Sequence, residues 1–167
     1  TVGSGGTSSI NFSSIPQTYT HLQIRGIVRQ SYPGAGGANL IYQFNNDPLT
    51  NGDTSNSNYV GHYLYGNSTP TIGSGISNRN YCADSINNGN TTGIFAVFTM
   101  DILDYNNTNK YRVFRTISGD DRGGVGQITL WSGFWKNTSA INQLTFYCDP
   151  TYSFVQYSQI ALYGIKG

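Results

Sequence analysis

The sequence predicts an all-β fold, a single antiparallel β-sandwich, most simply a jelly roll of about eight or nine strands. Glu is absent and Lys is scarce, whereas Gly, Ser, Thr and Asn are plentiful, so helix formers are few and strand and turn formers abound. Short apolar segments alternate with a period of two, and turn signals separate them at frequent intervals. The length of 167 residues suits one domain over residues 1–167, and the start at Thr1 without a methionine suggests that a short N-terminal segment is missing.

An immunoglobulin-like sandwich is the alternative to the jelly roll. That fold usually places a buried Trp between two bridged cysteines. Trp131 and Trp135 do lie between Cys82 and Cys148, but both are close to the second cysteine. The spacing therefore favours the jelly roll.

The first half of the chain contains four segments that alternate clearly enough to be predicted as strands: residues 8–12, 20–30, 39–45 and 58–66. The segment at 20–30 is the clearest, because its Leu, Ile and Val side chains alternate with His, Gln and Arg. Residues 46–57 form a long polar loop. Residues 67–93 show no sustained strand pattern, apart from a short strand expected at 81–84.

The second half contains five predicted strands: residues 94–103, 110–118, 127–135, 140–147 and 154–165. The first of these is apolar on both faces and is expected to be buried on both sides. The second is roughly amphipathic: Tyr111, Val113 and Ile117 oppose Lys110, Arg112 and Thr116, although Phe114 and Arg115 each lie on the opposite face to their kind. Its pattern predicts that the Val113 face packs inward.

Residues 126–136 are the most informative stretch, because both faces of this predicted strand are apolar. Ile128, Leu130 and Phe134 lie on one face, and Thr129, Trp131 and Trp135 lie on the other. One face can build the core of the domain, whereas the other needs a second sheet, a neighbouring subunit or a ligand such as a sugar. This surplus of apolar surface indicates binding or assembly more than catalysis.

Aromatic side chains are the candidate interface or glycan-binding residues. Aromatic rings stack on the apolar face of a pyranose and provide contact area at low entropic cost. The candidates are Trp131, Trp135, Tyr59, Tyr63, Tyr65, Tyr157 and Tyr163. The sequence favours a core or subunit interface for the central members, with a sugar platform as the alternative.

Composition and motifs exclude several function classes. The net charge is +1 and only 10% of residues are charged, so no electrostatic case exists for nucleic acid, and no apolar run is long enough to insert into a membrane. Asp101 with Asp104, or Asp120 with Asp121, are the candidate carboxylate pairs for hydrolysis, and turn capping explains the adjacent pair better. Asp47, Asn51 and Asp53 in one loop, or Asp120 and Asp121 in another, are the candidate calcium ligands, and solvated loop side chains explain them better. We therefore expect no enzyme activity, no cofactor and no metal.

Cys82 and Cys148 are the only two cysteines. One disulfide between them would close a long loop and stabilise the fold by about 4 kcal/mol in the chain-entropy model. Two thiols are equally compatible with the sequence. No CxxC spacing suggests zinc.

Three stretches carry a family resemblance: VGSGG at 2–6 followed by INFSSIPQTYTHL at 10–22, TLWSGFWKNTSAI at 129–141, and QYS with ALYGIK at 156–166. Together they resemble short virion proteins of tailed bacteriophages and the C-terminal domains of phage fibres. The resemblance implies a β-sandwich on the outside of a phage particle, assembled as a homotrimer with other virion proteins. Apolar strand faces that symmetric assembly could bury agree with this.

The function expected from the sequence is therefore that of a non-enzymatic virion surface protein. A fibre or receptor-binding module that recognises host-surface glycans is the first expectation, and a capsid decoration or cement protein is the alternative. A cellular carbohydrate-binding module, with Trp131 or Trp135 as its platform, is the more distant alternative.

Overall fold

A computed structural model describes residues 1–48, 58–67, 72–77, 80–148 and 151–167. This part of the chain forms eleven strands and contains no helix. The strands are β1 (Ser9–Phe12), β2 (His21–Gln30), β3 (Gly37–Phe44), β4 (Tyr59–Asn67), β5 (Ile72–Ser77), β6 (Tyr81–Asn87), β7 (Ala96–Leu103), β8 (Arg112–Asp121), β9 (Gly126–Trp135), β10 (Leu144–Tyr147) and β11 (Gln159–Ile165).

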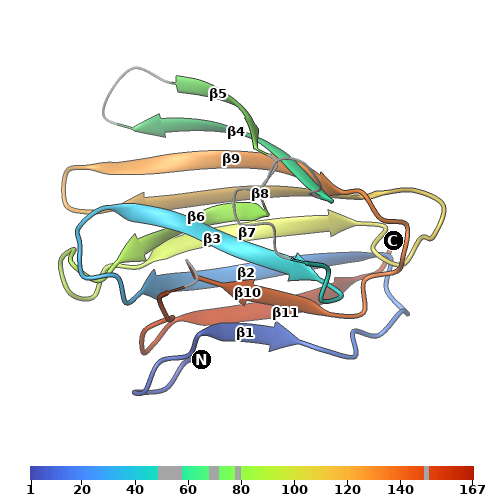
Figure 1. Ribbon diagram of the computed structural model, residues 1–167, viewed down its shortest axis with the longest axis horizontal. Coiled ribbons are helices and arrows are strands. Elements are labelled where there is room, and N and C mark those ends of the chain that lie inside the picture. The colour runs from blue at the N-terminus through green and yellow to red at the C-terminus, as the bar shows by residue number, and fades with distance from the viewer. Residues whose placement is uncertain (49–57, 68–71, 78–79, 149–150) are drawn as a thin grey trace.

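The strands form two packed layers, which confirms the predicted all-β sandwich. The larger layer is an antiparallel sheet of seven strands in the order β11-β2-β7-β8-β9-β4-β5. The smaller layer is antiparallel in the order β1-β10-β3-β6. In Figure 1, β3 and β6 cross in front of β7 and β8.

The two layers are joined where β2 pairs in parallel with β6. Arg29 pairs there with Ile86, and Gln30 with Asn87, so β2 contributes to both layers. Within the larger sheet, β7, β8 and β9 follow one another both along the chain and across the sheet. The finer expectation of a jelly-roll path through the two layers stays a prediction.

The core fills the space between the layers with large apolar and aromatic side chains. Its largest fully buried apolar members are Trp135, Tyr42, Tyr59, Tyr105, Phe44, Phe114, Phe146 and Phe154. The ring of Tyr42 lies 4.9 Å from that of Phe114, edge to face, and so links β3 of the smaller layer to β8 of the larger. Aromatic residues from both layers thus supply the core that short aliphatic side chains are too few to fill.

Two strands lie where the sequence showed no sustained pattern. β6 is longer than the expected segment at 81–84, because it is buried along most of its length and its polar side chains are satisfied by hydrogen bonds. β5, Ile72–Ser77, pairs with β4 and consists of two Ile, two Gly and two Ser residues, a composition that is unfavourable for strands.

The inward and outward faces of strand β8 are the reverse of those predicted. Arg112, Phe114 and Thr116 point inward, whereas Val113 and Ile117 are exposed. The reason is Arg112, whose buried guanidinium donates to four backbone carbonyls of the turns that flank β8 and β9: Tyr105, Lys110, Thr138 and Ser139. Burial lowers its pKa, and the hydrogen bonds offset the cost of desolvating the charge.

A second buried arginine holds loop backbone together. The guanidinium of Arg29 on β2 donates to the carbonyl oxygens of Asn88, Asn90, Thr91 and Ile94, at 2.8 to 2.9 Å. These hydrogen bonds hold the connection from β6 to β7 in place. The hydrogen bonds of Arg112 hold the turns beside β8 and β9 in the same way. The two arginines therefore immobilise loops, and neither is available to bind a ligand.

Candidate functional site

The central strand β9 carries apolar side chains on both faces, as predicted, but the tryptophan face is the one that points inward. Trp131 is 3% exposed and Trp135 is 1% exposed, whereas Leu130 is 44% exposed and Ile128 is 66% exposed. Of the alternatives that the sequence left open for Trp131 and Trp135, the core is therefore the one that the structure shows, and their assignment to an interface or a glycan platform is wrong. The smaller layer provides the aromatic surroundings that two indoles need, which the alternation of one strand cannot reveal.

Specific contacts hold each indole in the core. The ring of Trp131 lies 4.6 Å from that of Tyr63 and 6.4 Å from that of Tyr81. The ring of Trp135 lies 5.5 Å from that of Phe44, and its Nε1–H donates to a carboxylate oxygen of Asp47. The Nε1–H of Trp131 is buried and has no partner within the described residues.

The five candidate tyrosines do not form one platform. Tyr59 is fully buried, and its hydroxyl accepts from the Phe44 amide, so its assignment to an interface is also wrong. Tyr63 and Tyr65 are half-buried on the inner side of β4, with ring centroids 6.1 Å apart. Tyr157 is exposed ahead of β11, and Tyr163 is exposed on β11 beside Arg25. Only Tyr163 shares a surface with other exposed apolar side chains.

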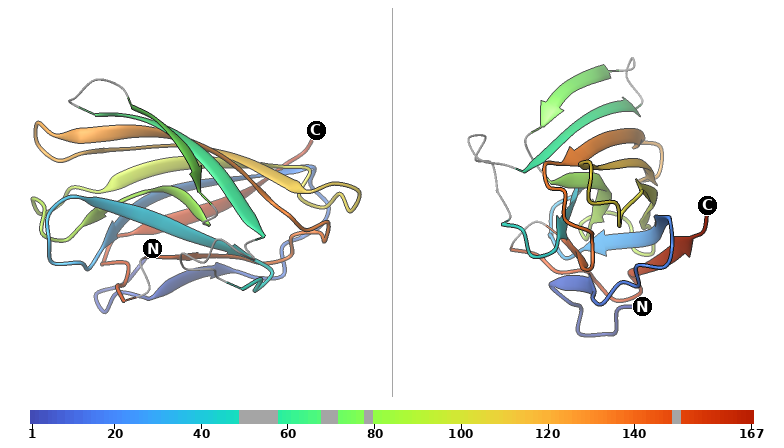
Figure 2. Two further views of the ribbon diagram at one scale, coloured as in Figure 1. Left: turned by 45° about the horizontal axis from the view of Figure 1, so that its top comes forward. Right: turned by 90° about the vertical axis from the view of Figure 1, so that its right-hand side faces the viewer.

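The surplus apolar surface lies on the outside of the seven-stranded sheet. We call this surface the outer face, and its apolar members are Ile27, Leu64, Val97, Leu103, Val113, Ile117, Ile128 and Leu130. These side chains are each about half exposed and come from β2, β4, β7, β8 and β9. Within the described chain the smaller layer covers only the opposite face of this sheet (Figure 2).

Cross-strand register arranges the outer face in rows. Val97, Gly119 and Ile128 are successive partners in one row, and Leu103, Val113 and Phe134 are successive partners in another. Side chains in such rows are close enough to form continuous apolar surface. The outer face is thus two apolar zones at opposite ends of the strands.

A polar row crosses the outer face between the two apolar zones. Gln23, Asp101, Arg115 and Ser132 are successive cross-strand partners. Gln23 donates to one carboxylate oxygen of Asp101 at 2.9 Å and accepts from Arg25, also at 2.9 Å. Arg115 makes no hydrogen bond or ion pair within the described residues, so this charge is left for water or a partner.

A glycine leaves a hollow in the outer face. Gly119 of β8 lies between Val97 and Ile128 and has no side chain to fill its position in the row. The hollow is bordered by Val97, Ile117 and Ile128. A Cβ at Gly119 would meet only ordinary contacts, the nearest at 3.4 Å, so the fold itself does not require glycine here.

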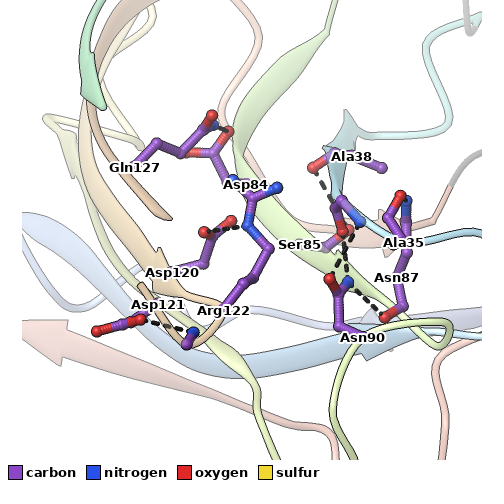
Figure 3. Close-up of polar contacts among 12 residues, drawn as sticks. Ala35, Ala38, Asp84, Ser85, Asn87, Asn90, Asp120, Asp121, Arg122 and Gln127 are labelled. Atoms are coloured by element: carbon purple, nitrogen blue, oxygen red, sulfur yellow. Dashed lines mark hydrogen bonds and ion pairs between the residues drawn. The ribbon is translucent and has the colours of Figure 1, made fainter. Parts of the chain in front are cut away.

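A second polar cluster lies between the layers, near the β8–β9 turn (Figure 3). The two carboxylate oxygens of Asp84 accept from Gln127 at 2.8 Å and from Ser118 at 2.7 Å. The carboxylate of Asp120 accepts from Arg122 at 2.9 Å through one oxygen, and its other oxygen is buried with no hydrogen-bond partner in the described part of the chain. Burial raises the pKa of Asp120, and the negative charge of Asp84 adds to this effect, against Arg122.

The cluster has a structural explanation. It ties β6 of the smaller layer to β8 and β9 of the larger, as Figure 3 shows for Asp84 and Gln127. Nearby, the side-chain amide of Asn90 accepts a hydrogen bond from the Gly36 N–H and donates one to the Gly36 carbonyl. Among the described residues no group of three or more His, Cys, Asp or Glu side chains is placed to hold a metal ion.

The other acidic candidates lie apart from this cluster. Asp104 sits beyond β7, where Lys110 donates to its carboxylate and lowers its pKa, and its amide donates to His21 Nδ1 at 3.0 Å. Asp101 belongs to the polar row of the outer face, and Asp121 accepts from the Gly123 amide in the β8–β9 turn. Most of the polar loop at 46–57 lies outside the described residues.

The two cysteines are buried reduced thiols, so the disulfide that the sequence left open is absent. Cys82 lies on β6, and its sulfur is 3.7 Å from the Leu40 carbonyl oxygen. Burial raises the pKa of Cys82, which keeps this thiol protonated and unreactive. Both side chains contribute to the core as small apolar groups.

Comparisons of the chain with protein-family models, curated proteins and solved structures find no match. No helix among the described residues is long and apolar enough to cross a membrane. The candidate functional site therefore rests on the geometry of the outer face. Sequence reasoning missed its polar row and its hollow, although the exposed alternation of Val113, Arg115 and Ile117 on one strand carried the signal.

Proposed function

We propose that this protein is a non-enzymatic surface protein of a tailed-bacteriophage particle, into which it is assembled through its outer face. The observation that carries the assembly role is the continuous set of half-exposed aliphatic side chains across β2, β7, β8, β9 and β4. The resemblance of both chain ends and of the β9 segment to phage virion proteins supports the location on the particle.

The energetics favour burial of the outer face. Fully burying a Val, Leu or Ile side chain is worth roughly 1.5–3 kcal/mol, so covering the exposed half of each gives about 1 kcal/mol per residue. Eight such side chains exceed the scattered apolar residues of an ordinary monomer surface. The exposed aliphatic side chains extend over five strands, which is more surface than a small-molecule site, a single cleft or cavity, requires.

Rigid loops at the ends of the sandwich suit a protein that presents a surface outward. Arg29 and Arg112 each fix loop backbone through several carbonyls, so the loops keep their shape without a bound ligand. A fibre or receptor-binding module would use such loops to contact host-surface glycans. A decoration protein would instead use them against neighbouring capsid subunits.

A cellular carbohydrate-binding module is less well supported than either virion role. That function depended on Trp131 or Trp135 as a sugar platform, and both indoles are enclosed in the core. Tyr163 is exposed, but Arg25 lies over its ring at 5.6 Å from the centroid and occupies the position a sugar would take.

Electron microscopy of intact phage particles with a gold-labelled antibody against this chain tests the proposal. The variant that replaces both Ile117 and Leu130 with Ser should remain folded but lose incorporation, because it removes apolar contact area from the centre of the outer face. Val125→Ser is the matched control, since Val125 is equally exposed but lies in the β8–β9 turn.

The position of the label separates the two virion roles. Label at fibre tips, with glycan binding on an array, supports the receptor-binding role, and label spread over the capsid lattice supports decoration. Particles that carry no label, or particles that incorporate the double variant as well as the wild type, would overturn the proposed function.

A further inference from the structure

We propose that the outer face binds a second copy of this chain, face to face, about a two-fold axis that runs parallel to the strands between β7 and β8. This inference deepens the proposed function and rests on the outer face being an assembly surface. Three features of the face carry it: its charges, its hollow and its extent.

The charges of the polar row are complementary under this axis. Asp101 on β7 and Arg115 on β8 are direct cross-strand partners, so the rotation places Asp101 of each copy opposite Arg115 of the other. Gln23 already binds one carboxylate oxygen of Asp101, whereas Arg115 has no partner within the described residues. An in-plane axis perpendicular to the strands would instead place like charges opposite each other, which is unfavourable.

The shape of the face is complementary under the same axis. Val97 and Gly119 are also direct partners on β7 and β8, so Val97 of each copy falls over the Gly119 hollow of the other. Leu103 and Val113 are partners in the same way and meet across the axis. One symmetry operation therefore pairs acid with base, projection with hollow and apolar with apolar.

The flanking strands extend the contact. β2 of one copy lies over β9 of the other, which brings Ile27 opposite Ile128. Arg25 falls opposite Leu130, but its guanidinium is drawn aside by Gln23 and by the Tyr163 ring, so its methylene stem provides the contact. No charge is left facing an apolar side chain at the centre.

The available area matches that of a stable dimer. Six strands at a spacing of about 4.8 Å, with about seven residues each, give a face of about 30 Å by 20 Å. This is about 600 Å² before the relief of the side chains is counted, and a standard interface buries about 800 Å² per partner. Two sheets packed in this way would be aligned, at about 10 Å, as the layers of a sandwich are.

This contact is isologous and produces pairs of subunits. A homotrimer, which the family resemblance implies, needs a contact between two different surfaces of the chain. A trimeric mass with no dimeric species would therefore overturn the two-fold contact.

A charge-swap experiment tests the pairing directly. Asp101→Arg and Arg115→Asp would each place two like-charge pairs in their own dimer, so each should raise the dissociation constant at least about 100-fold. In an equimolar mixture the heterodimer contains only opposite charges, and sedimentation velocity from nanomolar to micromolar concentration should show association restored to within about 10-fold of the wild type. Within each copy, residues 101 and 115 of a variant still carry like charges in the mixture. Association restored in the mixture therefore reports the contact between the two copies and not a change within one copy.

Filling the hollow gives an independent test. Gly119→Leu should abolish dimers while leaving the thermal unfolding of the monomer intact, because Gly119 lies on the outer face and a Cβ there would meet only ordinary contacts. Gly3→Leu is the control, since Gly3 is exposed ahead of β1, outside the outer face, and a Cβ there would meet nothing within 4 Å.

The outcomes separate this inference from the proposed function. The two-fold contact is overturned, and the assembly role is kept, by one pair of results. In that case the wild type associates or is incorporated into particles, but the mixture of the two charge variants associates no more tightly than either variant alone. A wild type that stays monomeric at micromolar concentration and is absent from particles overturns both.

Discussion

Trp131 and Leu130 are neighbours on β9 that point to opposite faces, so replacing each with Ala separates folding from assembly. Trp131 is 3% exposed and lies against the rings of Tyr63 and Tyr81, and truncating a core Trp to Ala costs about 3–5 kcal/mol. Leu130 is 44% exposed, so only its buried half contributes, and Leu130→Ala should cost about 1 kcal/mol. Because domains are stable by only about 5–15 kcal/mol, the first loss is large and the second is tolerable.

Urea unfolding at a concentration where the chain is monomeric measures the two costs, and sedimentation velocity measures association. Leu130→Ala should fold almost normally and associate more weakly, whereas Trp131→Ala should lose stability. Trp131→Phe is the matched control, because it keeps an aromatic ring at this position. It removes a buried N–H that has no partner within the described residues, so it should cost far less than Trp131→Ala.

The reverse ranking would refute the assignment of the faces. If Trp131→Ala left the midpoint of unfolding unchanged and only reduced association, the indole would belong to the binding surface, as the sequence had suggested. If Leu130→Ala destabilised the monomer by several kcal/mol, the outer face would be covered by the chain's own residues.

Four further substitutions test the buried polar groups and the packing. Arg112→Met should cost about 3–5 kcal/mol in urea unfolding, because it leaves loop carbonyls without their donor. Burial raises the pKa of Asp120 in the folded state, so its contribution to stability is complete below its unfolded pKa and is lost as pH rises through its folded pKa. The wild type should therefore lose stability relative to Asp120→Asn as pH rises above the unfolded pKa of about 3.9, and a difference in unfolding free energy that does not change with pH would contradict this. Gly26→Ala should lower stability by about 1–3 kcal/mol in thermal unfolding because its Cβ would lie 2.2 Å from an aromatic ring, whereas Gly119→Ala should stay within about 0.5 kcal/mol.

The all-β class and most strands could be predicted from the sequence because strand alternation and turn composition are local properties. β2, β3, β4 and β7 fall close to the expected segments. β6 could not be delimited, since its polar Asp84 and Ser85 are buried by hydrogen bonds to other strands and so break the alternation. Such bonds depend on tertiary partners that no window of sequence contains.

Which face of each strand points into the core was harder to predict from the sequence. On β8 the sequence grouped Val113 with Ile117 correctly, but it placed that group inside because aliphatic residues are usually buried. The hydrogen-bonding capacity of Arg112, which reaches four carbonyls at once, decided the opposite direction. A buried arginine is recognisable only when the turns that it binds are known.

The same inversion on β8 and β9 accounts for where the functional surface lies. Strand β9 has two apolar faces, so hydrophobicity alone leaves its orientation undetermined, and the smaller layer covers the face that carries the two indoles. The face left outside is then aliphatic, flat and crossed by the polar row of Asp101 and Arg115. Those charges disfavour non-specific stacking of this apolar sheet and favour a partner that offers the opposite charge at the same position, so in the proposed contact the polar row would provide specificity.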